Sequence, residues 1–136
     1  MIGVICENLI SINLEKFCDN NITIFSSSQT IKDIDNMSLF STYMSYHFEG
    51  ILLATTMNDS LLFVNNSTCK KKVFWVSEAE WYKFSPLLYK DLLKIFCSND
   101  IKILAQNKEI FNILESFIRK PDGIMESIDI KKIMEI

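Results

Sequence analysis

Glycine, proline, arginine and histidine are all scarce in this chain, and each scarcity argues against a class of protein. Three Gly and two Pro among 136 residues leave little room for flexible linkers, so we expect one domain over residues 1–136. His47 is the only histidine, which argues against Ser-His-Asp and Cys-His catalysis. Arg119 is the only arginine, the preferred side chain for bidentate contacts with bases and phosphates. We therefore expect no direct sequence-specific binding of nucleic acid.

Metal and cofactor motifs are also missing. The cysteines at positions 6, 18, 69 and 97 form no Cys-x-x-Cys pair, and no other ligand stands beside the single histidine, so we expect no metal site. Neither Gly-x-Gly-x-x-Gly nor Gly-x-x-x-x-Gly-Lys-Ser/Thr occurs in the sequence. A tightly bound NAD or a P-loop nucleotide is therefore not expected, and we predict no cofactor.

Long apolar runs are absent as well. The longest ones, such as residues 51–54, are far shorter than a membrane span, and the first residues lack the basic leader of a signal peptide. The net charge is −3. We expect a cytoplasmic protein without a membrane partner. An excess of Ile, Asn and Lys indicates an AT-rich genome of the kind found in many phages and bacteria, and for a phage protein the compartment would be the host cytoplasm.

Short apolar segments alternate with helical patterns along the whole chain. Apolar residues make up 49% of the sequence, which is typical of a globular domain. The segments predicted as strands are residues 2–6, 22–25, 51–54, 73–76, 101–105 and 124–125. This alternation predicts an α/β fold: a single Rossmann-like three-layer domain of about six mostly parallel strands, with helices on both faces.

Helix signals separate the predicted strands. Residues 8–20 carry an apolar stripe, and residues 31–48 keep helical spacing through Met37, Phe40, Met44 and Phe48, so we expect a helix in each. The later helices are predicted to begin at caps or at a proline, namely Thr56, Pro86, Asn107 and Asp129. In the helix after Asn107 we expect an inward face formed by Ile110, Phe111, Leu114, Phe117 and Ile118.

The segment after residues 73–76 is the main candidate for a ligand site. Ligands of open α/β sheets bind beyond the carboxyl ends of the strands, where Glu78, Glu80, Trp81 and Tyr82 would emerge. Carboxylates there can accept sugar hydroxyls or act as a base, while an aromatic face packs on a ring. The structural alternative is a helix start, with acidic side chains offsetting the helix dipole and Trp81 packed in the core.

Two further strand ends carry polar residues that could meet a ligand at the same edge. Thr55, Thr56 and Asn58 follow the strand at 51–54, and Asn107 with Lys108 follows the strand at 101–105. All of them are candidate ligand-binding residues. Each group also has a purely structural explanation, because Thr and Asn are common helix caps.

The order of these segments resembles a known family. Residues 51–65 are followed by Lys-Lys-Val-Phe-Trp-Val-Ser-Glu-Ala-Glu-Trp, then by Leu-Lys-Ile-Phe, the strand at 101–105 with Gln-Asn-Lys, and the ending Asp-Gly-Ile-Met-Glu-Ser-Ile-Asp. Over residues 50–130 this resembles the N-terminal Rossmann-like domain of GT-B-type glycosyltransferases, especially phage-encoded ones. The resemblance implies that Glu78, Glu80 and Trp81 line a cleft between two domains.

The same resemblance implies that the second domain of such an enzyme is missing from this sequence. Such enzymes bind the sugar nucleotide chiefly through a C-terminal domain, and this sequence ends about where that domain would begin. We therefore expect a domain that contributes to sugar transfer with a partner protein or as a homodimer, with no catalytic residue assigned. The alternatives are a non-catalytic protein that binds or sequesters a nucleotide or nucleotide-sugar, and a protein-interaction module that uses Tyr43, Tyr46, Trp81 and Tyr82.

Overall fold

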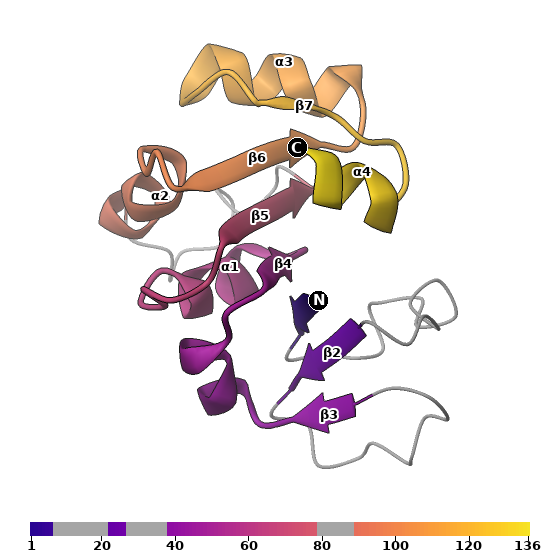
Figure 1. The fold of residues 1–136 in the computed structure, drawn as a ribbon. Coiled ribbons are helices and arrows are strands. Elements are labelled where there is room, and N and C mark those ends of the chain that lie inside the picture. The colour runs from indigo at the N-terminus through magenta and orange to yellow at the C-terminus, as the bar shows by residue number, and fades with distance from the viewer. Residues whose placement is uncertain (7–21, 27–37, 79–88) are drawn as a thin grey trace.

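The computed structural model describes residues 1–6, 22–26, 38–78 and 89–136, which form a parallel sheet with helices on both faces (Figure 1). The seven strands lie in the order β3-β2-β1-β4-β5-β6-β7, and every neighbouring pair is parallel. The strands are β1 (Ile2–Ile5), β2 (Ile22–Phe25), β3 (Ser38–Phe40), β4 (Ile51–Ala54), β5 (Lys71–Val76), β6 (Ile101–Ala105) and β7 (Gly123–Ile124). The first six follow the strand order of the doubly wound nucleotide-binding fold, so the Rossmann-like prediction is confirmed.

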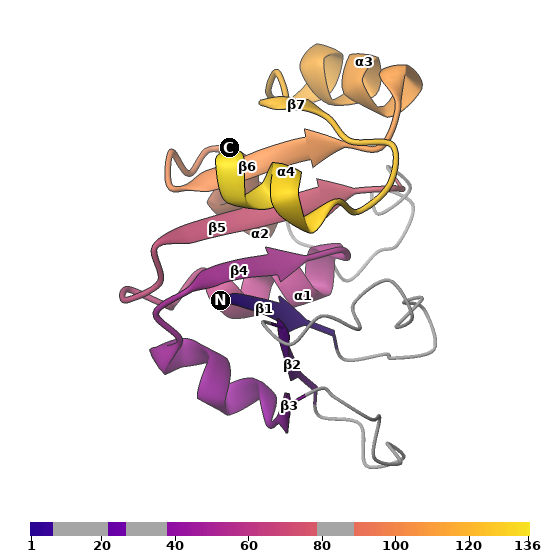
Figure 2. The ribbon, with the colours of Figure 1, turned by 45° about the vertical axis from the view of Figure 1, so that its right-hand side comes forward.

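Five helices accompany the sheet in the described part of the chain: the 3₁₀ helix η3 (Thr42–His47), α1 (Met57–Phe63), α2 (Tyr89–Phe96), α3 (Lys108–Phe117) and α4 (Ile130–Glu135). One core cluster joins Phe74 and Ile103 of the sheet to Phe63 of α1, Phe96 of α2 and Leu114 of α3. A second cluster, on the opposite face, contains Ile133 of α4. Figure 2 accordingly shows α4 in front of the sheet and α1 and α2 behind it.

The central strands form because the residues that face each side of the sheet are mostly apolar. Leu53 and Val73 belong to one core cluster, while Leu52 and Phe74, their neighbours in the chain, belong to the other. Such strands read as continuous apolar runs, the pattern by which they were predicted. Side-chain caps then fix the helix starts: the Thr56 hydroxyl accepts from the Asp59 amide of α1 at 3.1 Å, and the Asn107 side chain accepts from the Ile110 amide of α3 at 2.9 Å.

The predicted helix at 31–48 is wrong for the residues that the structure describes there. Residues 38–40 form β3, which pairs in parallel with Thr23–Phe25 of β2, and residues 42–47 form η3. The Phe40 ring lies 6.3 Å from the Phe25 ring, and the Phe48 ring lies 5.3 Å from it. The helical spacing of these aromatic residues therefore reflects packing around Phe25 and not a continuous helix. Residues 31–37, like the predicted helix at 8–20, lie outside the described residues.

Smaller differences concern single residues. The last strand covers Gly123–Ile124, one position earlier than predicted, and the first ends at Ile5. Phe117 was expected to face inward from α3 but is 81% exposed, because it is the last residue of the helix and the inward positions are taken by Ile110 and Leu114.

Candidate functional site

The carboxyl edge of the sheet is stepped. Phe40, Phe25, Ile5 and Ala54 are aligned with one another, so β3, β2, β1 and β4 end level. Ala54 pairs with Phe74, whereas β5 continues to Val76, which is level with Ala105 of β6. The strands from β5 onward therefore extend two positions beyond the other half of the sheet.

This step lies beside the point where the strand order reverses. Successive strands run from β1 to β3 on one side, and the chain then returns to place β4 on the other side of β1. In open α/β sheets, ligands usually bind beyond the carboxyl ends of the strands at such a switch point. Two strand positions correspond to about 7 Å. The end of β5 therefore extends about 7 Å beyond the end of β4, the strand that borders the switch point.

The residues that leave the strands at this junction are small and polar. Cys6 follows β1, Ser26 follows β2, and Thr55 follows β4. The backbone pairing continues through them: the Cys6 amide donates to the Phe25 carbonyl at 2.9 Å, and the Ser26 amide donates to the Phe40 carbonyl at 2.9 Å. Cys6 and Ser26 are buried and Thr55 is half-buried, so Thr55 is the most accessible of these three side chains.

The first turn of α1 adds a buried carboxyl to the same region. Asp59 is 3% exposed although it carries an ionisable side chain, and its amide is held by Thr56. Ser60 is fully buried and its hydroxyl donates to the Met57 carbonyl at 2.7 Å. In the sequence, Asp59 stands out only as an acidic residue in the first turn of a helix. Its burial, like that of Ser26, depends on the tertiary packing and leaves no local signal.

The structure places Glu78 on the overhanging side of the step. It is exposed and follows Ser77, which directly continues β5. Thr55 and Thr56 belong to the neighbouring strand end, so the structure brings these three predicted residues to one edge. The other predicted members of this group, Glu80, Trp81 and Tyr82, lie outside the described residues.

The remaining predicted site residues have structural contacts of their own. Thr56 caps α1, and Asn58 is exposed in the first turn of that helix. Asn107 caps α3, and the Lys108 Nζ atom lies 4.5 Å from the centroid of the Phe111 ring, a cation–π contact. Asn107 and Lys108 follow β6, one strand further from the switch point than Glu78. The caps make these side chains part of the scaffold, while their place at the carboxyl edge leaves their ligand-binding role a prediction.

The electrostatic character of the edge follows from its composition. Within the described residues, the positions that directly follow β1, β2, β4 and β5 include hydroxyls, a thiol and the Glu78 carboxylate but no lysine or arginine. No group of three or more His, Cys, Asp or Glu side chains suited to a metal ion occurs within residues 1–6, 22–26, 38–78 and 89–136. The described side chains at these strand ends are hydrogen-bonding groups: the hydroxyls of Ser26, Thr55 and Ser77 and the Glu78 carboxylate.

Comparison of the chain with protein-family models, with curated proteins and with solved structures finds no match in any of the three.

Proposed function

We propose that the chain is a glycosyltransferase-like domain whose carboxyl-edge crevice binds a sugar-bearing ligand, and that it contributes to sugar transfer together with a partner protein or a second copy. The observation that supports this most is the reversal of strand order between β1 and β4 beside the overhanging end of β5. In open α/β sheets that position is the usual place for a ligand.

The chemistry of the edge favours a sugar over a bare phosphate. Thr55 and Ser77 offer hydroxyl groups, and Glu78 is an exposed carboxylate that can accept two hydrogen bonds from neighbouring sugar hydroxyls. No basic side chain among the described residues at the ends of β4 and β5 would neutralise a phosphate. This agrees with the resemblance to the N-terminal half of GT-B enzymes, in which a second domain holds the nucleotide.

A ligand panel tests the proposal. The melting temperature would be followed with free disaccharides, nucleotides and nucleotide-sugars, because a ligand that binds the folded state raises it by mass action. We expect a shift with a sugar-bearing ligand, lost in Glu78→Gln and weakened in Thr55→Val. Glu49→Gln is the matched control, since Glu49 is an exposed glutamate next to the start of β4, at the opposite edge. The predicted residues Glu80 and Trp81 would be tested in the same way with Glu80→Gln and Trp81→Ala.

Turnover separates the enzyme from a non-catalytic binder. A shift accompanied by transfer of the sugar supports the glycosyltransferase-like function. A shift with a nucleotide or nucleotide-sugar and no product supports the alternative, in which the domain binds or sequesters the ligand. No shift with any sugar, nucleotide or nucleotide-sugar would contradict both.

A protein-interaction module is a second candidate, favoured by one feature. Tyr43 and Met44 of η3 are 75% and 53% exposed, and the Tyr43 and Tyr46 rings pack edge to face at 6.4 Å. Large exposed side chains of this kind are common at protein interfaces. Sizing of the purified chain and of a Tyr43→Ser, Met44→Ser variant tests this function, which predicts a complex that the variant does not form.

A further inference from the structure

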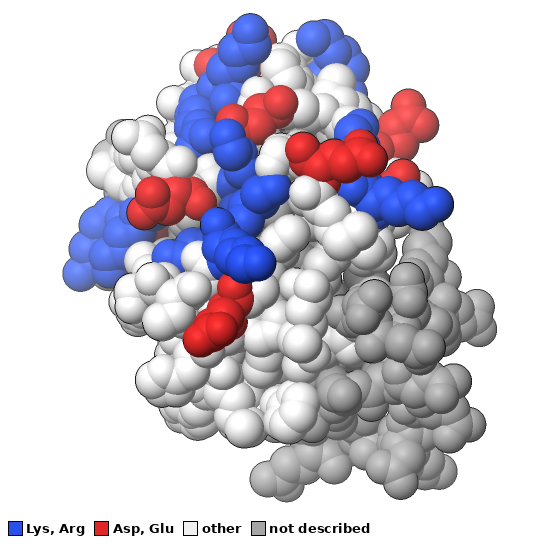
Figure 3. All heavy atoms as spheres, viewed as in Figure 1, with Lys and Arg blue, Asp and Glu red and all other residues white. Residues whose placement is uncertain are grey.

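Basic side chains gather at the amino edge of the sheet, opposite the proposed ligand site. They lie at the starts of β5 and β6 and just after α3, and we call this group the basic edge: Lys70, Lys71, Lys72, Lys102, Arg119 and Lys120. Pairing aligns Lys71 with Ile51 and Lys72 with Ile101, so the lysines at the starts of β5 and β6 lie on neighbouring strands. Figure 3, which looks onto the face covered by α4, shows basic side chains over the upper part of the molecule, with acidic ones between them.

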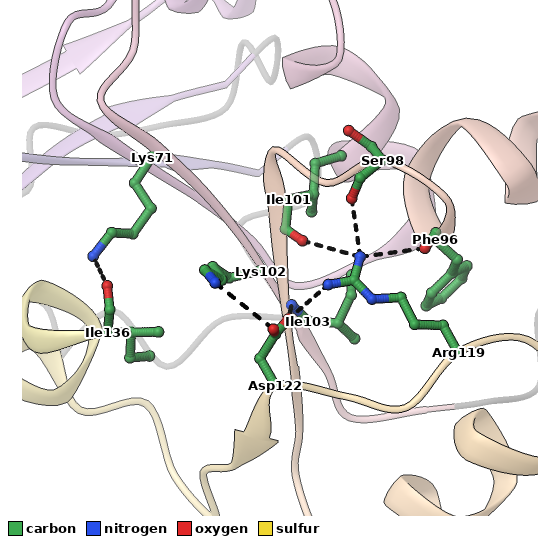
Figure 4. Close-up of polar contacts among 9 residues, drawn as sticks. All are labelled: Lys71, Phe96, Ser98, Ile101, Lys102, Ile103, Arg119, Asp122 and Ile136. Atoms are coloured by element: carbon green, nitrogen blue, oxygen red, sulfur yellow. Dashed lines mark hydrogen bonds and ion pairs between the residues drawn. The ribbon is translucent and has the colours of Figure 1, made fainter.

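Some members of the basic edge have structural partners. Arg119 binds carbonyl oxygens and Asp122, Lys71 donates to the Ile136 carbonyl, and Lys102 lies 3.8 Å from the Asp122 carboxylate (Figure 4). Lys102 still has a side chain that is 42% exposed. Lys70 and Lys120 are exposed and form no ion pair with another described residue. The edge therefore keeps lysines that can interact with an external anion.

Two exposed apolar side chains stand near members of the basic edge, on helices that cover opposite faces of the sheet. Phe117 is 81% exposed at the end of α3, two residues before Arg119. Met134 is 52% exposed on α4, two residues before Ile136, whose carbonyl Lys71 binds. Large apolar side chains beside lysines are typical of surfaces that rest on a membrane, with the apolar groups entering the interface and the lysines meeting anionic headgroups.

We infer that the basic edge, with Phe117 and Met134, docks on the surface of a membrane that contains anionic lipid. A nucleic acid fits less well, because the single arginine is occupied by protein carbonyls and lysine cannot form the bidentate contacts that nucleic acids favour. No described helix is long and apolar enough to cross a bilayer. The sequence predicts no membrane partner because it contains neither a spanning segment nor a signal peptide, and a surface of this kind requires neither.

This orientation has a geometric consequence. All strands point the same way, so an amino edge resting on lipid directs the carboxyl edge and its crevice toward the solution. The inference does not depend on the proposed function, since it uses residues at the other end of the sheet. Membrane binding and ligand binding can therefore fail separately.

Vesicle sedimentation tests the inference. Vesicles of phosphatidylcholine alone would be compared with vesicles that contain about a third phosphatidylserine, with NaCl raised from about 0.1 M to about 0.5 M to screen the charges. We expect binding only with phosphatidylserine, and less of it at high salt. Each lysine near an anionic leaflet contributes roughly five-fold in affinity, so Lys70→Gln with Lys120→Gln should weaken binding about 25-fold. Phe117→Ser should weaken it further.

The matched control removes the same charge elsewhere. Lys90 and Lys131 are exposed lysines of α2 and α4 outside the basic edge, and Lys90→Gln with Lys131→Gln should bind nearly as the parent chain does. Melting temperatures show whether both variants remain folded. Absence of binding to the anionic vesicles would overturn the inference, as would an equal loss in the control pair. Tight binding to duplex DNA without binding to vesicles would overturn it in favour of a nucleic-acid surface.

Discussion

Arg119 and Asp122 form an ion pair in which the guanidinium Nη2 atom lies 3.0 Å from the Oδ2 atom, and both residues also bind the backbone around the start of β6 (Figure 4). The Arg119 Nη1 atom donates to the carbonyl oxygens of Ser98 at 2.9 Å and of Phe96 and Ile101 at 3.3 Å. Asp122 Oδ2 accepts from the Ile103 amide at 2.8 Å. The pair thus joins the end of α2, the start of β6 and the turn before β7.

Arg119→Lys is expected to destabilise the protein by about 2 kcal/mol. Lysine keeps the charge, but a single ammonium cannot bind the carbonyl oxygens and the carboxylate in the planar arrangement of a guanidinium, and hydrogen bonds to charged groups contribute more than neutral ones. Urea unfolding followed by circular dichroism measures the change. Lys131→Gln, which alters an exposed lysine of α4, should stay within about 0.5 kcal/mol of the parent, and a similar value for Arg119→Lys would contradict the prediction.

Asn66→Ala is expected to cost about 3 kcal/mol. The Asn66 side chain is buried, and its amide donates to the Ser45 carbonyl at 2.6 Å and to the Phe48 carbonyl at 3.1 Å. Its oxygen accepts from the amides of Thr68 at 2.7 Å and Cys69 at 2.8 Å. Alanine would remove all four of these hydrogen bonds and leave the Thr68 and Cys69 amides without this acceptor, and at about 1 kcal/mol per bond the loss amounts to a few kcal/mol.

The neighbouring residue supplies the control for Asn66. Asn65 is exposed, so Asn65→Ala should change the free energy of unfolding by less than about 0.5 kcal/mol. Thermal unfolding of both variants measures the difference between two identical substitutions at adjacent positions. Equal melting temperatures would show that the Asn66 contacts do not stabilise the fold.

Sequence patterns predict those helices and strands that are determined by residues close together in the chain. The strands at 22–25, 51–54 and 101–105 have the bounds predicted for them, because a strand buried on both faces appears as a mostly apolar run, broken here only by Thr23 and Lys102. Thr56, Asn107 and Asp129 mark helix starts through their own side chains. The edge strand β3 has no such mark, since its three residues are extended only because they pair with β2.

The candidate site, too, is only partly predictable from local sequence. The sequence predicts which residues follow each strand, and a parallel sheet then brings Thr55, Thr56 and Glu78 to one edge. The step between β4 and β5 depends on the register, which no local pattern records. The burial of Asp59 depends likewise on the packing of α1 against distant segments.

Gly3→Ala is expected to destabilise the protein by about 2 kcal/mol through overpacking. A Cβ atom at Gly3 would lie 2.8 Å from Phe25 Cε2, 2.9 Å from Phe48 Cε1 and 3.0 Å from Leu52 Cδ2. These side chains belong to one core cluster and cannot all move without strain. At Gly123 the nearest contact would be Leu104 Cδ2 at 3.6 Å, an ordinary packing distance, so Gly123→Ala should be tolerated. Chemical denaturation of the pair tests this, and equal losses at both positions would contradict it.

Cys97 is expected to be alkylated much faster than Cys69 at pH 8. Cys97 is exposed at the end of α2, whereas Cys69 is half-buried in the turn before β5 and its burial raises the pKa of the thiol. The thiolate is the reactive form, and a raised pKa reduces its fraction at any pH below that value, so the Cys69 rate should keep rising as the pH is increased toward 10. Timed labelling with iodoacetamide and mass spectrometry of the separate peptides measures both rates. The unfolded chain in urea is the control, in which the two rates should become similar, and a rate at Cys69 that already equals that of Cys97 in the folded protein at pH 8 would show that burial does not protect this thiol.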